Sequence, residues 1–400
     1  MTSSSTSFDV AVLGGGVFGL WIARRCAAVG LTTALVDKAK PGSGASGGPL
    51  GALMPHVPDR WNAKKQFQFE ALTTLATEIA DLESETGLAT GYRRTGRLMP
   101  IRTAGFLRQS AERQEDSRSR WTAHDPDLVF AVESAVDPAG WLAEAATPLG
   151  HVRETLAARV QPRALCRALA ASVARTCSVF DGFEVGAIDG QSGRVLATDG
   201  RQSINAGTIV LTTGYQSFGL LDQITGLALG KGVKGQAVLL DTREDPAHPI
   251  VYDDGTYVIV HDDGRTAIGS TSENVWTSAS VPDPSNRAFL DRAFALVPAL
   301  AGTPIVEWWA GVRPKCIERD PMIGFLPDTP RIMVATGGFK ISFGIAHKVA
   351  DSVMALLDGV DPDLPETFRA EHHFTRAMAR TDRDEADEFA ATAQTAKPHP

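Results

Sequence analysis

Residues 8–38 read FDVAVLGGGVFGLWIARRCAAVGLTTALVDK. An apolar, β-branched run at 10–13 leads into three consecutive glycines, and a segment with helical periodicity and a second apolar strand at 33–36 follow. This order of strand, tight turn, helix and strand is the context in which a G-x-G-x-x-G motif binds a dinucleotide. Asp37 stands directly after the second strand, where its carboxylate can accept the ribose hydroxyl groups. The stretch therefore predicts a dinucleotide site.

The three glycines of the motif have separate physical roles. Gly14 permits the sharp turn, Gly16 lets the backbone approach a pyrophosphate, and Gly19 lets the helix pack closely on the strand. The helix N-terminus presents unpaired N–H groups and partial positive charge to the phosphates. A purely structural turn is the alternative, but it would not require the strand, helix and terminal acid to occur together.

Composition limits the classes of partner. The chain has 400 residues, of which 43% are hydrophobic, and this suffices for a large core and two or three compact units. The net charge is −8, so no overall basic excess is present to neutralise phosphates. We therefore expect no nucleic-acid partner.

The cysteines and the N-terminal residues predict a cytoplasmic location. The four cysteines form no CxxC pair, which fits free thiols in a reducing compartment. The leader MTSSSTS has neither the basic nor the apolar region of a signal peptide. The apolar segment 10–29 is interrupted by two arginines, so we expect no membrane span.

Patterns along the rest of the chain predict an α/β fold. Residues 63–86 show the apolar stripe of an amphipathic helix, and residues 233–275 alternate like antiparallel strands between Asp-Asp-Gly turns. Strand–helix units recur in the middle and near the end of the chain. We therefore predict a discontinuous Rossmann-like domain (1–90, 151–225 and 314–362), an interleaved α+β substrate domain on an antiparallel or mixed sheet (91–150 and 226–313), and a disordered, charged tail (376–400).

FAD, NAD and NADP all fit the first motif, and the choice depends on later segments. Three further glycine-bearing segments follow predicted strands: the loop 43–53, Thr213-Gly214 and Gly337-Gly338. A long cofactor with a flavin ring at its far end requires several close backbone approaches. The sequence also has no histidine in a context that indicates an acid or base beside a nicotinamide. FAD is therefore favoured.

The chain resembles the FAD-dependent D-amino-acid oxidase superfamily over residues 8–360, in particular its glycine oxidase, sarcosine oxidase and D-amino-acid dehydrogenase branches. Six motifs occur in the family's order: the N-terminal fingerprint, ASGG with GALMPH at 45–56, KGQ at 234–236, IGSTSE at 268–273, GVRP at 311–314 and TGGFKISFG at 336–344. The resemblance implies an FAD domain of the glutathione-reductase type and a separate substrate domain. It also implies oxidation of the C–N bond of a small amino acid or N-substituted glycine by hydride transfer to flavin, and hydrolysis of the resulting imine to an oxo acid and an amine.

Four positions match catalytic or substrate-binding positions of these relatives. Arg313 of GVRP matches the arginine that pairs with the substrate carboxylate, a task for which the planar guanidinium is suited. Tyr257 matches an active-site tyrosine of the glycine-oxidase branch. Lys340 stands where relatives have arginine or lysine, to bind the carboxylate or lie near the flavin carbonyls. His56 follows the flavin-contacting loop and is a candidate to face the pocket.

The motifs and the resemblance together imply a set of FAD contacts and no metal ligands. The expected contacts are Gly14, Gly16, Val17, Phe18, Gly19, Asp37, Lys38, Ser43, Ser46, Gly47, Gly51, Leu53, Val185, Thr213, Gly214, Gly338, Phe339, Lys340 and Ile341.

Two positions depart from the relatives. Sarcosine-oxidase-like members attach FAD to a cysteine near the position of Arg313, but Cys316 lies in a different context, KCIERD, so we expect non-covalent FAD. Those members also have a lysine, assisting the reaction with oxygen, where Ala267 stands here. The electron acceptor is thus O2 or another oxidant.

Other activities stay open on the sequence. Arg313 would recognise the acid group of a substrate and not its nitrogen, which also suits a 2-hydroxy-acid or glycerol-phosphate-type dehydrogenase. A flavin-binding subunit of a larger dehydrogenase is a further alternative. The GALMPH segment also resembles the flavin domain of a bacterial tRNA-modifying enzyme, but the acidic charge and the TGGFKISFG segment argue against that assignment.

Overall fold

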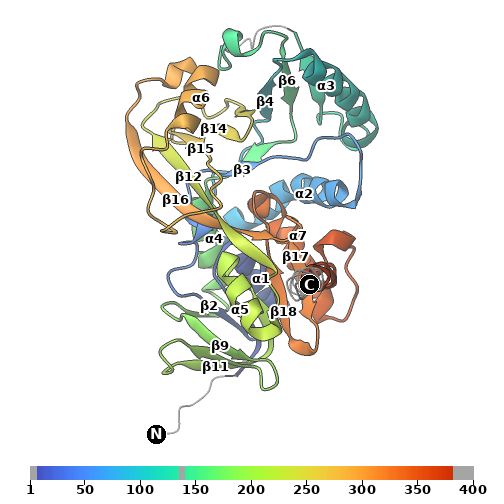
Figure 1. The fold of residues 1–400 in the computed structure, drawn as a ribbon, viewed down its shortest axis with the longest axis vertical. Helices are drawn as coiled ribbons and strands as arrows, with labels where there is room; N and C mark the ends of the chain where they lie inside the picture. Colours follow the sequence, from blue (N-terminus) through green and yellow to red (C-terminus); the bar gives the residue numbers. More distant parts are fainter. Residues whose placement is uncertain (1–6, 135–139, 382–400) are drawn as a thin grey trace, which may run out of the picture.

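The computed structural model describes residues 7–134 and 140–381, and two large β-sheets organise it (Figure 1). The first sheet has the strand order β17-β18-β11-β1-β2-β8, and a hairpin of β9 and β10 extends it from β11. Its strands are β1 (Ser7–Leu13), β2 (Thr33–Val36), β8 (Ser178–Phe180), β9 (Val185–Asp189), β10 (Arg194–Ala197), β11 (Ser203–Leu211), β17 (Met322–Leu326) and β18 (Thr329–Thr336).

Strand β1 lies at the centre of the parallel part of this sheet. It pairs in parallel with β11 on one side and β2 on the other, and β8 and β18 continue the parallel order outward. Because successive side chains point to opposite faces, Val10 and Val12 join one hydrophobic cluster while Ala11 and Leu13 join another. Both faces are therefore buried, as expected of a parallel sheet.

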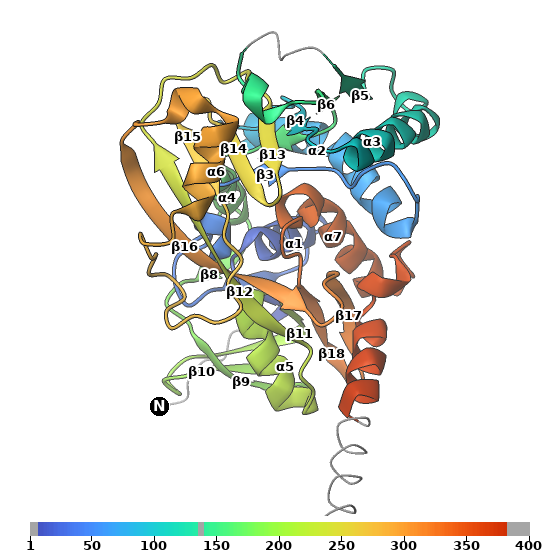
Figure 2. The same cartoon turned by 45° about the horizontal axis from the view of Figure 1, so that its top comes forward.

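Helices from distant parts of the sequence cover the two sheets. The α-helices are α1 (Val17–Ala28), α2 (Ala63–Thr86), α3 (Ala104–Ser117), α4 (Pro162–Val173), α5 (Ser217–Thr225), α6 (Ala288–Leu296) and α7 (Ser342–Leu357), of which α3 and α6 contact strands of the second sheet. Helix α1 packs against α4 and α7 on one face, and α2 and α7 lie side by side (Figure 2). Residues of α5 join the cluster on the other face.

The second sheet has the order β16-β12-β15-β14-β13-β4-β6-β5. It is antiparallel except where β13 runs parallel to β4, so the predicted mixed sheet is confirmed. Helix α6 packs on it through a third cluster that contains Phe289 and Leu290. Its strands are β4 (Arg97–Pro100), β5 (Phe130–Glu133), β6 (His151–Glu154), β12 (Gly230–Leu240), β13 (Ile250–Asp253), β14 (Thr256–Val260), β15 (Thr266–Gly269) and β16 (Ile305–Cys316); β3 (Ala52–Leu53) and β7 (Ala158–Arg159) form a separate pair.

Each sheet draws on separated parts of the chain, which confirms the predicted α/β class with an interleaved second sheet. Strand β6 belongs to the second sheet although it lies just past the boundary expected at residue 150. The expected disordered tail is wrong for its first residues, because 370–381 are helical and Phe374 and Ala377 pack into the core. Residues 382–400 lie outside the described part. Within 7–134 and 140–381, no helix has both the length and the apolar character that a membrane crossing requires.

The close packing of α1 on β1 gives a direct test of the turn. A Cβ atom at Gly19 would lie 1.9 Å from the carbonyl oxygen of Gly14, whereas a Cβ at Gly105, in α3, would meet open space. We expect Gly19→Ala to lower the free energy of unfolding by about 1–3 kcal/mol through overpacking. Gly105→Ala, the control, should change it by less than about 1 kcal/mol. Thermal unfolding followed by circular dichroism measures both, and equal stabilities would contradict the assigned contact.

Candidate active site

The turn between β1 and α1 is closed by contacts that only glycine permits. Gly14 has φ 108°, and a Cβ there would lie 2.4 Å from the carbonyl oxygen of Thr212. The Thr212 hydroxyl, just after β11, donates to the carbonyl oxygens of Leu13 and Gly14 at 2.8 Å each. Two neighbouring parallel strands therefore fix the turn at their carboxyl ends, where α/β sheets bind ligands.

Asp37 directly follows β2 and lies beside the same turn. One carboxylate oxygen, Oδ2, accepts the amide N–H of Gly15 at 2.6 Å, and the other, Oδ1, accepts that of Ala39 at 2.9 Å. Burial raises the pKa of Asp37, and these two hydrogen bonds oppose the rise. The carboxylate thus has a fixed orientation, and Asp37 lines the adjoining cavity.

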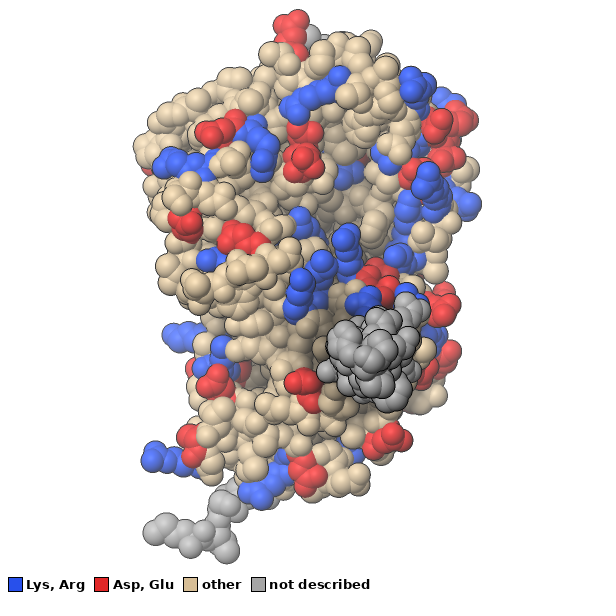
Figure 3. Space-filling model, viewed as in Figure 1, with Lys and Arg blue, Asp and Glu red and all other residues tan. Residues whose placement is uncertain are grey.

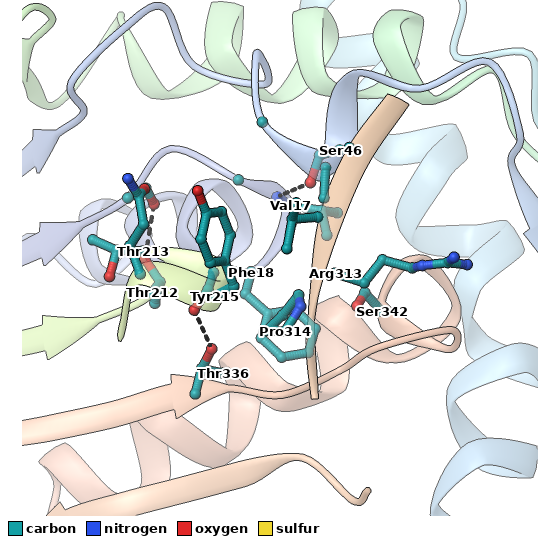
Figure 4. A pocket seen from close by; sticks show the side chains of 18 of the residues that line it. Val17, Phe18, Ser46, Thr212, Thr213, Tyr215, Arg313, Pro314, Thr336 and Ser342 are labelled. Carbon is teal, nitrogen blue, oxygen red and sulfur yellow. Dashed lines mark hydrogen bonds between the residues drawn. The ribbon is translucent and has the colours of Figure 1, made fainter. Parts of the chain in front are cut away.

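The start of α1 is open to a ligand. The Val17 amide donates to the Ser46 hydroxyl at 3.1 Å, as Figure 4 shows. A Cβ added at Gly16 would meet only that hydroxyl, at 3.5 Å, so the backbone faces free space. A helix N-terminus with accessible amides is suited to phosphate.

A cavity of about 730 Å³ connects this turn to the second sheet. It is bounded by the β1–α1 turn, the segment after β2, the ends of β9 and β11, strands β12 and β16, and the segment before α7. Its size is in the range of ligand pockets. Figure 4 shows Arg313 extending from β16 on the side opposite to Thr212 and Thr213.

The guanidinium of Arg313 is held in place by hydrogen bonds to the two residues that follow β15. Nη1 donates to the Ser270 hydroxyl at 3.1 Å and Nη2 to the Thr271 carbonyl at 2.5 Å, while Nε is buried without a partner in the described chain. A Cβ at Gly235, on the paired strand β12, would lie 2.0 Å from Nη2, so this glycine makes room for the guanidinium. Burial lowers the pKa of Arg313, against the opposing effects of Tyr257 and Glu273.

Three other predicted or adjacent side chains gather at this end of the cavity. The Phe339 ring centroid lies 5.6 Å from Arg313 Cζ and 5.9 Å from Lys340 Nζ. Burial, with the Arg313 charge, lowers the pKa of Lys340 to about 8. Burial, with nearby Tyr252, raises the pKa of Tyr257 to about 12, and the residue is only 9% exposed. Tyr257 is therefore a neutral phenol near neutral pH.

The structure brings most of the predicted residues to the cavity and leaves six outside its lining. Arg313, Tyr257 and Lys340 line it, together with Gly14, Gly16, Val17, Phe18, Asp37, Lys38, Ser43, Ser46, Val185, Thr213, Gly214, Gly338 and Phe339. The six outside are Gly19, Gly47, Gly51, Leu53, Ile341 and His56. The first five pack against neighbouring backbone or core side chains, and Gly19 has the packing role that its place in the motif predicts.

The structure does not bring His56 to the pocket. Its amide donates to the side-chain oxygen of Gln68 in α2 at 2.6 Å, and the residue is exposed. The expectation that it faces the pocket is therefore corrected, because the chain leaves the cavity before residue 56.

Sequence reasoning left some lining residues unassigned. Of the tryptophan pair 308–309, which the sequence suggests as core residues with one of them at the pocket, Trp309 lines the cavity. It packs over two glycines, since a Cβ at Gly48 would lie 2.9 Å from its ring and a Cβ at Gly311 would lie 2.4 Å away. The GVRP glycine, Gly311, could have pointed to this ring. The other missed residues include Glu184, Tyr215, Gln216, Ser270 and Ser280, whose positions depend on long-range strand pairing.

Cys316 is separated from the cavity. It is fully buried, it does not line the cavity, and a Cβ at Gly337 would lie 2.2 Å from its sulfur. All four cysteines are free. Among the described residues, no cluster of His, Cys, Asp and Glu could hold a metal ion.

These features fit FAD. The carboxylate of Asp37 and the start of α1 suit the nucleotide and its phosphates, and the cavity continues to the aromatic and cationic side chains at β16. An extended cofactor can therefore lie along it.

The expected hydrogen bonding of Asp37 to the ribose of FAD can be tested, with another carboxylate of the same strand pair as the control. Asp37→Ala should weaken FAD binding about tenfold or more, since it removes charged hydrogen bonds. Asp9 lies at the opposite end of the same strand pair, where its side chain binds Thr32, and Asp9→Ala should leave FAD affinity unchanged. Titration of the flavin-free protein with FAD, followed by fluorescence, measures both. Equal affinities of the Asp37→Ala protein and the unaltered chain would refute the assignment.

Comparisons with known proteins agree with this geometry. The model of the FAD-dependent oxidoreductase family (DAO) matches residues 9–352. Glycine oxidase of Pseudomonas aeruginosa is 28% identical over 361 residues, which cover 88% of this chain and 95% of that protein. Glycine oxidase of Bacillus licheniformis is 23% identical over 372 residues, which cover 91% of this chain and 97% of that protein.

The fold is also found among solved structures. The crystal structure of glycine oxidase from Geobacillus kaustophilus superposes with a TM-score of 0.81 at 22% identity, covering 92% of this chain and 99% of that one. The resemblance seen in the six sequence motifs is therefore confirmed. The chain belongs to the FAD-dependent oxidoreductase family, and it is an FAD-binding enzyme.

Proposed function

We propose that this protein oxidises the C–N bond of a small amino acid or N-substituted glycine. The imine would hydrolyse to an oxo acid and an amine or ammonia. The observation that carries the proposal is the guanidinium of Arg313 in the cavity that begins at the dinucleotide turn. When bound, the flavin supplies the acceptor for the hydride that leaves the substrate carbon.

Arg313 is suited to bind the substrate carboxylate. A guanidinium has five N–H donors. Two are used by Ser270 and Thr271, which fix the orientation of the group and leave donors on Nη1, Nη2 and the unpartnered Nε. A carboxylate can accept two of these in parallel, and this pins the substrate relative to the ring site.

The charges around Arg313 favour a neutral amine. The nitrogen lone pair must be free to form the C=N bond, and the positive field of Arg313 and Lys340 disfavours an ammonium group nearby. Tyr257, as a neutral phenol, can donate a hydrogen bond to the bound substrate. The reaction therefore requires orientation and no dedicated general base.

Aromatic rings and one long loop limit the access of water. Trp309, Phe339 and Tyr257 line the cavity, and the loop 271–287 contributes Ala279 and Ser280. The side chains of two β12 residues hold this loop: Lys234 Nζ donates to the Val281 carbonyl at 2.7 Å, and the Asp283 amide donates to the Gln236 side-chain oxygen at 2.6 Å. Exclusion of water would protect the imine until it leaves.

A 2-hydroxy-acid dehydrogenase is the second candidate, because Arg313 would bind the acid group of either substrate class. The glycine oxidase relatives favour the amine. We further propose non-covalent FAD, O2 or another oxidant as acceptor, and a cytoplasmic location, for which the four free cysteines are the support.

The role of Arg313 predicts a selective kinetic defect. Arg313→Met should raise the apparent substrate constant by about tenfold or more, because charged hydrogen bonds to the carboxylate are lost, while flavin content stays the same. Arg153, an exposed arginine of β6 paired with Glu133, provides the control variant Arg153→Met, with unchanged kinetics. Steady-state rates with sarcosine and glycine provide the measurement. If Arg313→Met kept the original substrate constant, the assigned role would be wrong.

The burial of Cys316 predicts that the flavin is not covalently attached. Acid precipitation should leave all yellow colour in the supernatant, and Cys316→Ser should still copurify with FAD. A yellow pellet from the unaltered chain, lost in Cys316→Ser, would show that a covalent bond exists.

A further inference from the structure

Five basic side chains gather around the Arg313 end of the cavity, and none of them forms an ion pair within the described residues. They are Lys231, Arg313, Lys315, Arg319 and Lys340. Elsewhere in this acidic chain, arginines such as Arg25, Arg97 and Arg163 are paired with carboxylates. Figure 3 shows Lys and Arg side chains gathered near the middle of one face.

These cations crowd one another. Lys315 Nζ lies 6.0 Å from the Phe339 centroid, which Arg313 and Lys340 also approach. Lys315 stands directly opposite Lys231 in the β12–β16 ladder. Like charges in such a pair destabilise a sheet. Contact with one aromatic ring offsets only part of this repulsion.

Among the described residues, no acidic side chain lines this end of the cavity. The lining carboxylates, Asp37 and Glu184, belong to the first sheet's end of the cavity. Glu273, whose charge acts on Arg313, lies outside the lining and accepts hydrogen bonds from Gln236 Nε2 at 2.8 Å and the Thr271 hydroxyl at 2.5 Å. A ligand bound at this end therefore meets an excess of positive charge from the side chains that line it.

One carboxylate accounts for the free donors of Arg313 but leaves Lys340 unpaired. Lys340 lines the cavity and makes no hydrogen bond within the described chain, only its contact with the Phe339 ring. Burial and the charge of Arg313 lower the pKa of Lys340, and an anion bound beside it would favour the charged form. A second acidic group on the ligand would supply that anion.

We propose that the substrate is dicarboxylic, with one acid group held by Arg313 and the second held by Lys340 within a field that Lys315, Lys231 and Arg319 reinforce. This inference rests on the proposed amine oxidation and narrows its substrate class. The second acid group is placed either on the side chain or on the nitrogen substituent of the amino acid.

Non-reactive acids test binding without turnover. We expect malonate or succinate to perturb the flavin absorbance of the FAD-loaded protein with at least tenfold lower dissociation constants than acetate or propionate at constant ionic strength. Lys340→Met should remove this advantage by weakening the binding of the dicarboxylates more than that of acetate. The matched control is Lys348→Met, since Lys348 also lies over a phenylalanine, Phe67, but is paired with Glu70.

Pairs of amine substrates that differ by one acid group extend the test to turnover. They also distinguish a failure of the dicarboxylate inference from a failure of the proposed function. We expect kcat/KM to be at least tenfold higher for N-carboxymethylglycine than for N-methylglycine, or for aspartate than for glycine. This ratio should decrease as salt is added, because salt screens the attraction between charges. The dicarboxylate inference would be overturned if mono- and dicarboxylates bound with equal dissociation constants, or if Lys340→Met weakened the binding of both by the same factor. Either result would leave amine oxidation intact. A flavin that no amine reduces would overturn the proposed function and this inference with it.

Discussion

The contact between helix α1 and strand β1 is the constraint on which the rest of the structure depends. Gly14 and Gly19 allow backbone atoms to approach where any side chain would clash, and Thr212 fastens the turn to the adjoining strand. As a result of this packing, the N-terminus of α1 faces the cavity, and the carboxylate of Asp37 lies beside the turn. The first sheet is thus organised around a binding edge for a nucleotide.

The second sheet places the chemistry at the other end of the same cavity. Strands β12 and β16 pair over most of their length, so Arg313 lies opposite Val233, directly before the KGQ segment, and Gly235 provides space for its guanidinium. Ser270 and Thr271, just after β15, fix that group. An acid-bearing substrate would then meet a pre-oriented cation, which lowers the ordering cost of binding.

Local patterns in the sequence predicted local structure well. The bounds of α2, the strand–turn–helix unit at β1 and the position of Asp37 depend on neighbouring residues and on periodicity, and the structure confirms them. Arg313 was found through the GVRP motif, and its location in the cavity agrees with that prediction.

Features set by long-range packing could not be predicted in the same way. The opposition of Lys231 and Lys315 depends on the β12–β16 register, which a single sequence does not reveal. The helix at 370–381 has few large apolar residues, yet the spacing of Phe374 and Ala377 lets it pack on the core. His56 follows a cavity-lining segment, but the chain turns toward α2 before it.

Anaerobic absorption spectroscopy of the FAD-loaded protein tests the central claim most directly. Addition of a small amino acid or N-carboxymethyl amine should bleach the visible flavin band, and the matched hydroxy acid should leave it unchanged. Bleaching by hydroxy acids alone, or by neither class, would contradict the account that this cavity oxidises an amine held by its carboxylate.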